Sequence, residues 1–210
     1  MTTVCVFCAS SEAVGEVHRG TARALGRAIA EQGWGLMYGG GNIGLMGEVA
    51  RAALDAGGEV TGVIPHLLAE REVALEDVTR LIRTDTMRER KALMDEGSDV
   101  FVVLPGGIGT LEEVVEILTL KQLGYHQRPI ILLDPTGYWD PLMVLLERMV
   151  EQGLADPELT RLLESVDSVP AAVAAVRERH GMVAGDPSDL ALELETGDAS
   201  AQEELEEKGS

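Results

Sequence analysis

A glycine-rich turn near the middle of the chain constrains the fold more than any other feature. Residues 104–114 read Leu-Pro-Gly-Gly-Ile-Gly-Thr-Leu-Glu-Glu-Val. The β-branched run at residues 99–104 predicts a buried strand, and the run at residues 110–123 has the spacing of a helix. Where a strand passes through glycines into a helix, free backbone N–H groups and the helix dipole attract an anion, typically a phosphate. The turn therefore predicts an anion site within a strand–helix unit.

The same order of strand and helix recurs along the chain. Strands are expected at residues 4–8, 35–38, 59–64, 78–82, 99–104 and 129–133, and helices at residues 14–32, 45–56, 86–96, 110–123, from 140 onward and at 169–180. Thr86 and Glu89 form a capping box, and Asp140 is expected to cap the helix whose first turn contains Pro141. This alternation predicts an α/β, Rossmann-like fold: a doubly wound, mostly parallel sheet with helices on both faces and the ligand at the carboxyl ends of the strands.

Length and charge limit the number of domains and the kinds of partner. The 210 residues suit one buried domain, expected over residues 1–180, and the acidic composition of residues 181–210 predicts a disordered tail. A net charge of −19 and an aromatic content of 3% argue against nucleic acid or an anionic membrane as partner. No apolar run approaches the ~20 residues of a membrane span. Because the N-terminus also lacks the basic start of a signal peptide, we expect a cytoplasmic protein.

Two further patterns have weaker functional interpretations. Gly39-x-Gly41-x-x-Gly44 matches the dinucleotide fingerprint, but the next strand ends without an acid and no Lys-Ser or Lys-Thr follows. Tight backbone packing and a second wall of a nucleotide pocket both stay open for this turn. Cys5 and Cys8 form a C-x-x-C pattern, yet a strand directs them to opposite faces. With the histidines scattered as well, we expect neither a metal nor a cofactor.

Charged residues gather beside the central glycine turn. Arg88, Arg90 and Lys91 lie at the start of a predicted helix, where a solvated face and a phosphate-binding face both remain possible interpretations. Glu112 and Glu113 diverge by about 100° on a helix, so only one of them can face a ligand at the turn. Both acids would also be favoured simply by the helix N-terminus. A lone carboxylate beside a sugar suits cleavage of an N-glycosidic bond, whose transition state is positively charged at the anomeric carbon.

Together these residues resemble the Lonely Guy family of cytokinin-activating phosphoribohydrolases. The resemblance rests on Pro105-Gly106-Gly107-x-Gly109-Thr110-x-x-Glu113 and covers about residues 4–153. Supporting motifs are Met87-x-x-Arg90-Lys91, Gly39-Gly40-Gly41 with Gly44-Leu45-Met46, and Gln122-Leu123-Gly124. The chain departs from the family at Ala9, where a glycine is usual, and at Arg88, where a histidine is frequent. Neither departure removes a catalytic position.

The resemblance implies that a homodimer hydrolyses N6-isopentenyl-AMP, with AMP as a further candidate, to free base and ribose 5-phosphate without a cofactor. Arg90 and Glu113 correspond to the family's catalytic pair. The positions that correspond to its substrate contacts are Glu72, Arg90, Lys91, Gly106, Gly107, Ile108, Gly109, Thr110, Leu111, Glu112, Glu113 and Thr119. The name lysine decarboxylase, often used for such sequences, fits poorly because only three lysines could hold pyridoxal phosphate: Lys91, Lys121 and Lys208.

Two alternatives to this function stay open. A nucleosidase acting on purine and pyrimidine nucleotides more broadly would use the same residues. A nucleotide-sensing module would bind without cleavage, although it would not need a carboxylate beside the anomeric carbon.

Overall fold

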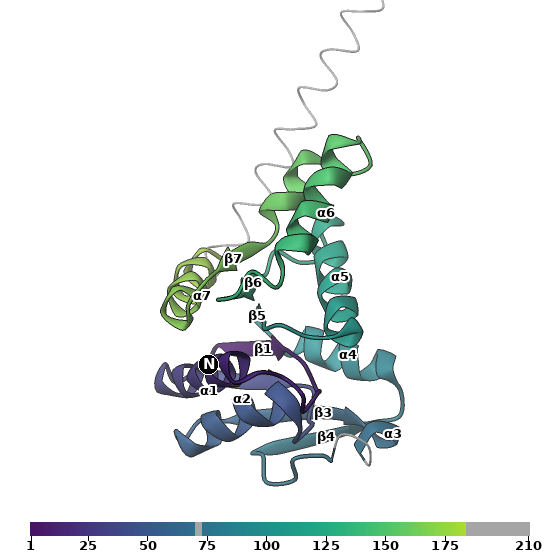
Figure 1. Ribbon diagram of the computed structural model, residues 1–210. Helices are drawn as coiled ribbons and strands as arrows, with labels where there is room; N and C mark the ends of the chain where they lie inside the picture. The colour runs from purple at the N-terminus through teal and green to yellow at the C-terminus, as the bar shows by residue number, and fades with distance from the viewer. Residues whose placement is uncertain (70–72, 184–210) are drawn as a thin grey trace, which may run out of the picture. The chain divides into compact units, whose positions relative to one another are not determined.

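Seven parallel strands form one sheet in the computed structural model, which describes residues 1–69 and 73–183. The strands are β1 (Thr3–Phe7), β2 (Gly35–Tyr38), β3 (Val60–Pro65), β4 (Arg80–Thr84), β5 (Val100–Val103), β6 (Ile130–Leu133) and β7 (Glu164–Val166). Their order in the sheet is β4-β3-β2-β1-β5-β6-β7, and each neighbouring pair is parallel (Figure 1). Glu72 and the predicted tail from residue 184 onward lie outside the described residues.

Helices cover both faces of the sheet. They are α1 (Glu16–Glu31), α2 (Gly44–Asp55), α3 (His66–Ala69), α4 (Met87–Glu96), α5 (Ile108–Gln122), α6 (Asp140–Glu151) and α7 (Val169–Val183), with a 3-10 helix at Pro157–Arg161. In Figure 1, α1, α2 and α7 lie on one face of the sheet and α4, α5 and α6 on the other. The predicted doubly wound α/β fold is therefore confirmed, and the sheet is parallel throughout its seven strands.

The order of the strands reverses at β1, which pairs with β2 on one side and β5 on the other. Since α1 and α5 cover opposite faces, the carboxyl ends of β1 and β5 form the crevice where ligands of such sheets bind. The central glycine turn follows β5 and lies at this crevice. The fold thus places the predicted anion site at the topological switch point.

Alternation along β1 explains why its two cysteines do not act together. Val4, Val6 and Cys8 pack into the apolar core on the α1 side, whereas Cys5 and Phe7 pack into the core on the α5 side. Both thiols are buried and unbridged, and burial raises the pKa of Cys5. The prediction that the two sulfurs lie on opposite faces is confirmed.

Several local predictions differ from the structure. The three-residue β7 and the four-residue α3 were not expected. Trp139, not Asp140, is the N-cap of α6, because the Asp134 carboxylate accepts the Trp139 N–H at 2.6 Å and so sets where the helix begins. At α4 the Thr86 hydroxyl accepts from the Glu89 N–H as predicted, but the Glu89 carboxylate returns to the N–H of Asp85. Within residues 1–69 and 73–183, no helix combines the length and apolar character that crossing a membrane requires.

Candidate active site

The glycine turn leaves the start of α5 without a cap. Gly107 is the N-cap residue with an extended backbone, and no side chain caps the helix. Among the described residues, no hydrogen-bond acceptor contacts the N–H groups of residues 107–110, whereas the Leu111 N–H donates to the Gly107 carbonyl. Uncapped N–H groups at a helix N-terminus are the usual donors to a phosphate or carboxylate. The turn therefore has the geometry of an anion site.

A cavity of about 270 Å³ opens beside this turn. It is lined by side chains and backbone from the loop after β1, from α2, from α4 and from the start of α5: Cys8, Ser10, Met46, Arg90, Gly107, Ile108, Gly109, Thr110 and Glu113. We call it the glycine-turn cavity. Its volume lies just below the usual range for small-molecule sites. It is large enough to hold part of a nucleotide, such as the sugar phosphate.

Arg90 and Glu113 meet at the wall of the glycine-turn cavity. Their side chains approach to 3.5 Å between Nη1 and Oε1, and the two residues are only 7% and 8% exposed. The Arg90 Nε–H also donates to the Val63 carbonyl at 3.1 Å. A Cβ at Gly39 would lie 2.2 Å from Nη2 of Arg90, so the absence of a side chain there makes room for the guanidinium. The Arg90 guanidinium is thus fixed by an ion pair, by a hydrogen bond and by close packing against Gly39. Such a fixed pair of charges suits a reacting centre.

The structure distinguishes between the two interpretations of the basic cluster Arg88, Arg90 and Lys91, a solvated helix face and a phosphate-binding face. Arg90 shares the buried face of α4 with Met94, as the spacing indicates, whereas Arg88 is exposed. Lys91 forms ion pairs with Glu112 and, at 2.8 Å, with Glu116 on α5. Burial alone would lower the pKa of Lys91, but the two carboxylates outweigh it and raise the pKa. Of the three basic residues, Arg90 therefore enters the glycine-turn cavity and Lys91 holds α4 against α5.

Glu112 and Glu113 diverge as predicted from their spacing on a helix. The Glu112 side chain is about half exposed and pairs with Lys91, while Glu113 is buried beside Arg90. Glu113 also lines a second cavity of about 390 Å³ between α4 and α5. Its other lining residues are Phe7, Arg88, Lys91, Ala92, Asp95, Glu96, Glu116, Ile117 and Leu120. The Glu113 carboxylate thus stands between an anion site and a larger, partly apolar space.

The other predicted contact residues fall into two groups. Gly107, Ile108, Gly109 and Thr110 line the glycine-turn cavity, and Gly106 directly precedes them. Thr119 is exposed, its hydroxyl donates to the Val115 carbonyl at 2.7 Å, and it lines neither cavity. Leu111 packs partly buried against the core. The structure therefore gathers the residues near the turn, whereas Thr119 lies apart from both cavities.

The first glycine turn serves mainly as backbone packing. Gly40 and Gly44 have positive φ angles of 78° and 58°, and a Cβ at Gly44 would lie 2.7 Å from the Ala9 carbonyl oxygen. The Leu45 N–H donates to the same oxygen at 2.9 Å, which joins α2 to the loop after β1. Only Met46 from this region lines the glycine-turn cavity. Sequence reasoning missed Cys8, Ser10 and Met46 as lining residues, although Cys8 and Ser10 follow the carboxyl end of β1 and Met46 lies in the first turn of α2.

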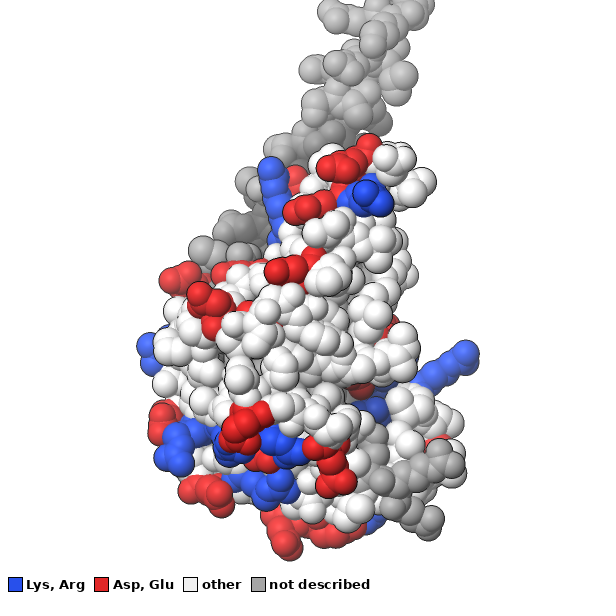
Figure 2. Space-filling view, in the orientation of Figure 1, with Lys and Arg blue, Asp and Glu red and all other residues white. Residues whose placement is uncertain are grey.

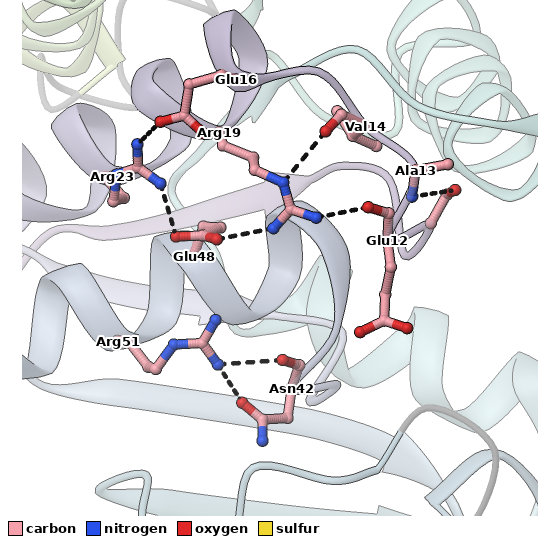
Figure 3. Close-up of polar contacts among 10 residues, drawn as sticks. Glu12, Ala13, Val14, Glu16, Arg19, Arg23, Asn42, Glu48 and Arg51 are labelled. Atoms are coloured by element: carbon pink, nitrogen blue, oxygen red, sulfur yellow. Dashed lines mark hydrogen bonds and ion pairs between the residues drawn. The ribbon is translucent and has the colours of Figure 1, made fainter.

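An arginine network fixes the loop that carries Ser10 (Figure 3). Arg19 donates from Nε to the Val14 carbonyl at 3.1 Å and from Nη2 to the Glu12 carbonyl at 2.6 Å. Its Nη1 pairs with Glu48 of α2 at 2.8 Å, and Arg23 pairs with the same carboxylate. Burial opposes the charge of Glu48, but the two arginines outweigh it and lower its pKa. In Figure 2, basic and acidic side chains are interspersed over the part of the surface where Figure 1 places α1 and α2.

Two of the three lysines, Lys91 and Lys121, are engaged in contacts with the protein. An amine that forms a Schiff base must first lose its proton, and the raised pKa of Lys91 opposes that loss. Lys121 donates to the Leu162 carbonyl at 3.1 Å, and Lys208 lies outside the described residues. Across the described part of the chain, no three His, Cys, Asp or Glu side chains are grouped as metal ligands would be.

Comparison with known proteins identifies the family. A family model described as "Possible lysine decarboxylase" matches residues 46–176. A cytokinin riboside 5'-monophosphate phosphoribohydrolase of Mycobacterium tuberculosis is 44% identical over 173 residues, which cover 82% of this chain and 92% of that protein. A probable enzyme of the same name from Oryza sativa is 44% identical over 175 residues, covering 83% and 77%. Among solved structures, the molybdenum cofactor carrier protein of Chlamydomonas reinhardtii is 26% identical with a TM-score of 0.66, covering 84% of this chain and 96% of its own. By its family match, by these identities and by its glycine-turn motif, the chain belongs to the Lonely Guy family of phosphoribohydrolases.

Proposed function

We propose that this protein hydrolyses the N-glycosidic bond of cytokinin riboside 5'-monophosphates, with N6-isopentenyl-AMP and AMP as substrates, to free base and ribose 5-phosphate. The observation that carries the proposal is the Glu113 carboxylate, buried beside Arg90 and standing between the glycine-turn cavity and the α4–α5 cavity. The names of relatives at 37–44% identity support the same reaction.

The two cavities suit the two halves of a nucleotide. The phosphate binds at residues 107–110, where the uncapped N–H groups and the helix dipole favour an anion despite the chain's net charge of −19. The base enters the α4–α5 cavity, whose apolar wall includes Phe7, Ile117 and Leu120. The bond between base and ribose then lies beside Glu113, which lines both cavities.

Arg90 and Glu113 have different roles in the reaction. A water molecule adds its oxygen to the anomeric carbon, and the bond to the base nitrogen breaks with its electron pair leaving on the base. The base gains one proton as it departs, and this balances the proton that the water loses. Glu113 as a carboxylate stabilises the positive charge that develops on the ribose and orients the water. An arginine guanidinium does not give up its proton in proteins, so Arg90 acts as a fixed electrostatic clamp on ribose or phosphate oxygens rather than as an acid.

The remaining parts of the proposal concern assembly and location. We assign the catalytic domain to residues 1–180, with Lys91, which lines the α4–α5 cavity, as a further substrate contact. A homodimer is supported by exposed apolar side chains on α5 and α6, namely Val115, Leu123, Val144 and Leu145. Sedimentation equilibrium tests it, since a monomer at micromolar concentration would rule it out. A cytoplasmic location fits the two buried, unbridged cysteines.

The decisive test is base release from N6-isopentenyl-AMP, AMP and the corresponding nucleosides, with Glu113→Gln as the test variant. Glu31→Gln is the control, because Glu31 is exposed at the end of α1 and lines neither candidate cavity. We expect release from the monophosphates, a loss of about 100-fold or more in kcat for Glu113→Gln, and near-normal kcat for the control.

Other results of the base-release assay would favour a different mechanism or function. Near-normal turnover by Glu113→Gln would remove that carboxylate from the mechanism. AMP binding without any release would indicate a nucleotide-binding module, a role that the likeness to a cofactor carrier makes worth testing. Equal rates on purine and pyrimidine monophosphates would indicate the broader nucleosidase.

A further inference from the structure

Tyr138 contacts the glycine turn without lining the glycine-turn cavity. Its hydroxyl donates to the Gly106 carbonyl at 2.6 Å, across 32 residues of sequence. Tyr138 and Gly106 line a different cavity, of about 270 Å³, which contains neither Arg90 nor Glu113. Gly107 lines both spaces. The turn therefore separates the two cavities, with Tyr138 on one side and the candidate reacting pair on the other.

The turn before α6 places the Tyr138 side chain. The buried Asp134 carboxylate accepts from the N–H groups of Thr136 at 3.2 Å and Trp139 at 2.6 Å. Burial alone would raise the pKa of Asp134, but the backbone donors of Trp139, Tyr138 and Thr136 outweigh it and lower the pKa. The Tyr138 ring meets the buried Trp139 ring edge-on at 4.9 Å. The ring is thus held by contacts that do not depend on its hydroxyl.

The bond from Tyr138 controls the direction of one N–H group in the turn. The Gly106 carbonyl and the Gly107 N–H belong to the same planar trans peptide, so they point in opposite directions. Glycines on both sides of this peptide permit conformations that other residues resist, and a Cβ at Gly107 would meet no atom within 4 Å. Among the described residues, the Tyr138 hydroxyl is the one hydrogen-bond donor to the Gly106 carbonyl, so its loss would leave this carbonyl without the bond that orients it.

From this geometry we infer that Tyr138 is a positioning residue: by holding the Gly106 carbonyl, its hydroxyl turns the Gly107 N–H away from Tyr138 and toward the anion in the glycine-turn cavity. The inference rests on the proposed function in placing the substrate phosphate at this turn. The Gly107 N–H contacts the phosphate equally in the bound substrate and in the transition state, because the phosphate takes no part in bond cleavage. Loss of the hydroxyl should therefore weaken binding and leave the chemical step unchanged.

The test is Tyr138→Phe, which removes only the hydroxyl. We expect KM for the nucleoside monophosphate and the Kd for ribose 5-phosphate both to rise about 10-fold, with kcat within about 2-fold of the original. The melting temperature should stay within about 2 °C, because the ring keeps its contact with Trp139. Tyr125→Phe is the matched control: Tyr125 is 77% exposed, and its hydroxyl bonds to no described residue.

Calorimetric titration of ribose 5-phosphate and of inorganic phosphate separates this inference from the proposed function. Binding by the unmodified protein that weakens in Tyr138→Phe would support the positioning role even if no substrate were cleaved. Equal phosphate affinity in the two proteins would overturn it. A fall in kcat at unchanged KM would also overturn it, since Tyr138 would then act on the chemical step.

Discussion

Replacing Gly109 by alanine should make the protein more stable and less active. Gly109 is the second residue of α5, its φ is not in the left-handed region, and a Cβ there would meet no atom within 4 Å. Alanine should therefore fit without strain and stabilise the helix by about 0.5–1 kcal/mol, mainly by restricting the unfolded chain. For a chain of this size, that gain corresponds to a rise of about 1–4 °C in melting temperature.

The same methyl group would occupy the glycine-turn cavity that Gly109 lines. Displacing a bound phosphate by about 1 Å costs on the order of 10–100-fold in rate, so we expect kcat/KM for N6-isopentenyl-AMP to fall by about that factor. Thermal melting and steady-state base release measure the two effects.

Gly20→Ala in α1 is the matched control. Its Cβ would meet only the end of the Arg23 side chain, at 4.0 Å, and Gly20 lines neither candidate cavity. We expect a similar gain in melting temperature with unchanged kcat/KM. Unchanged kcat/KM in Gly109→Ala would refute the placement of the phosphate at this turn. A lower melting temperature would refute the argument that the space is empty.

Two further predictions follow from the same structure. Arg90→Lys keeps the positive charge but loses the planar guanidinium that reaches both the Val63 carbonyl and Glu113. We therefore expect kcat to fall about 100-fold. Full activity of this variant would show that the charge alone suffices. Asp134 has a folded-state pKa below its ordinary 3.8, so the stability it contributes is present above that pH and lost as pH falls through the lower folded value. Urea unfolding should therefore show Asp134→Asn less stable than the original protein at pH 7, with the difference in stability shrinking as pH falls below 3.8. A difference independent of pH would contradict the assignment.

Features with a local physical cause were predictable. The strand, glycines and helix at residues 99–123 follow from apolar periodicity and from the absence of side chains at the turn. The opposite directions of Cys5 and Cys8, the divergence of Glu112 from Glu113, and the shared face of Arg90 and Met94 follow from strand and helix geometry alone. These relations need no knowledge of what packs against the element.

Features that depend on distant partners were not predictable. The edge strand β7 has only three residues, none of them fully buried, and it is defined by pairing with β6. The predicted start of α6 at residue 140 is confirmed, but its N-cap was misassigned by one residue, because the Asp134 side chain, five residues before Trp139, accepts the Trp139 N–H. Local capping rules do not reach that far.

The sequence by itself determined the order of the elements, the doubly wound parallel class and the anion-binding turn, because periodicity and glycine positions act over a few residues. Only the tertiary structure decided which basic residue lines the glycine-turn cavity. The three basic residues Arg88, Arg90 and Lys91 are chemically similar and close in sequence. The Arg90 guanidinium fits at the cavity because Gly39, in the turn after β2, has no side chain to occupy that space. The same holds for the bond from Tyr138 to Gly106, since burial and contact across the chain are set when the sheet and its helices pack together.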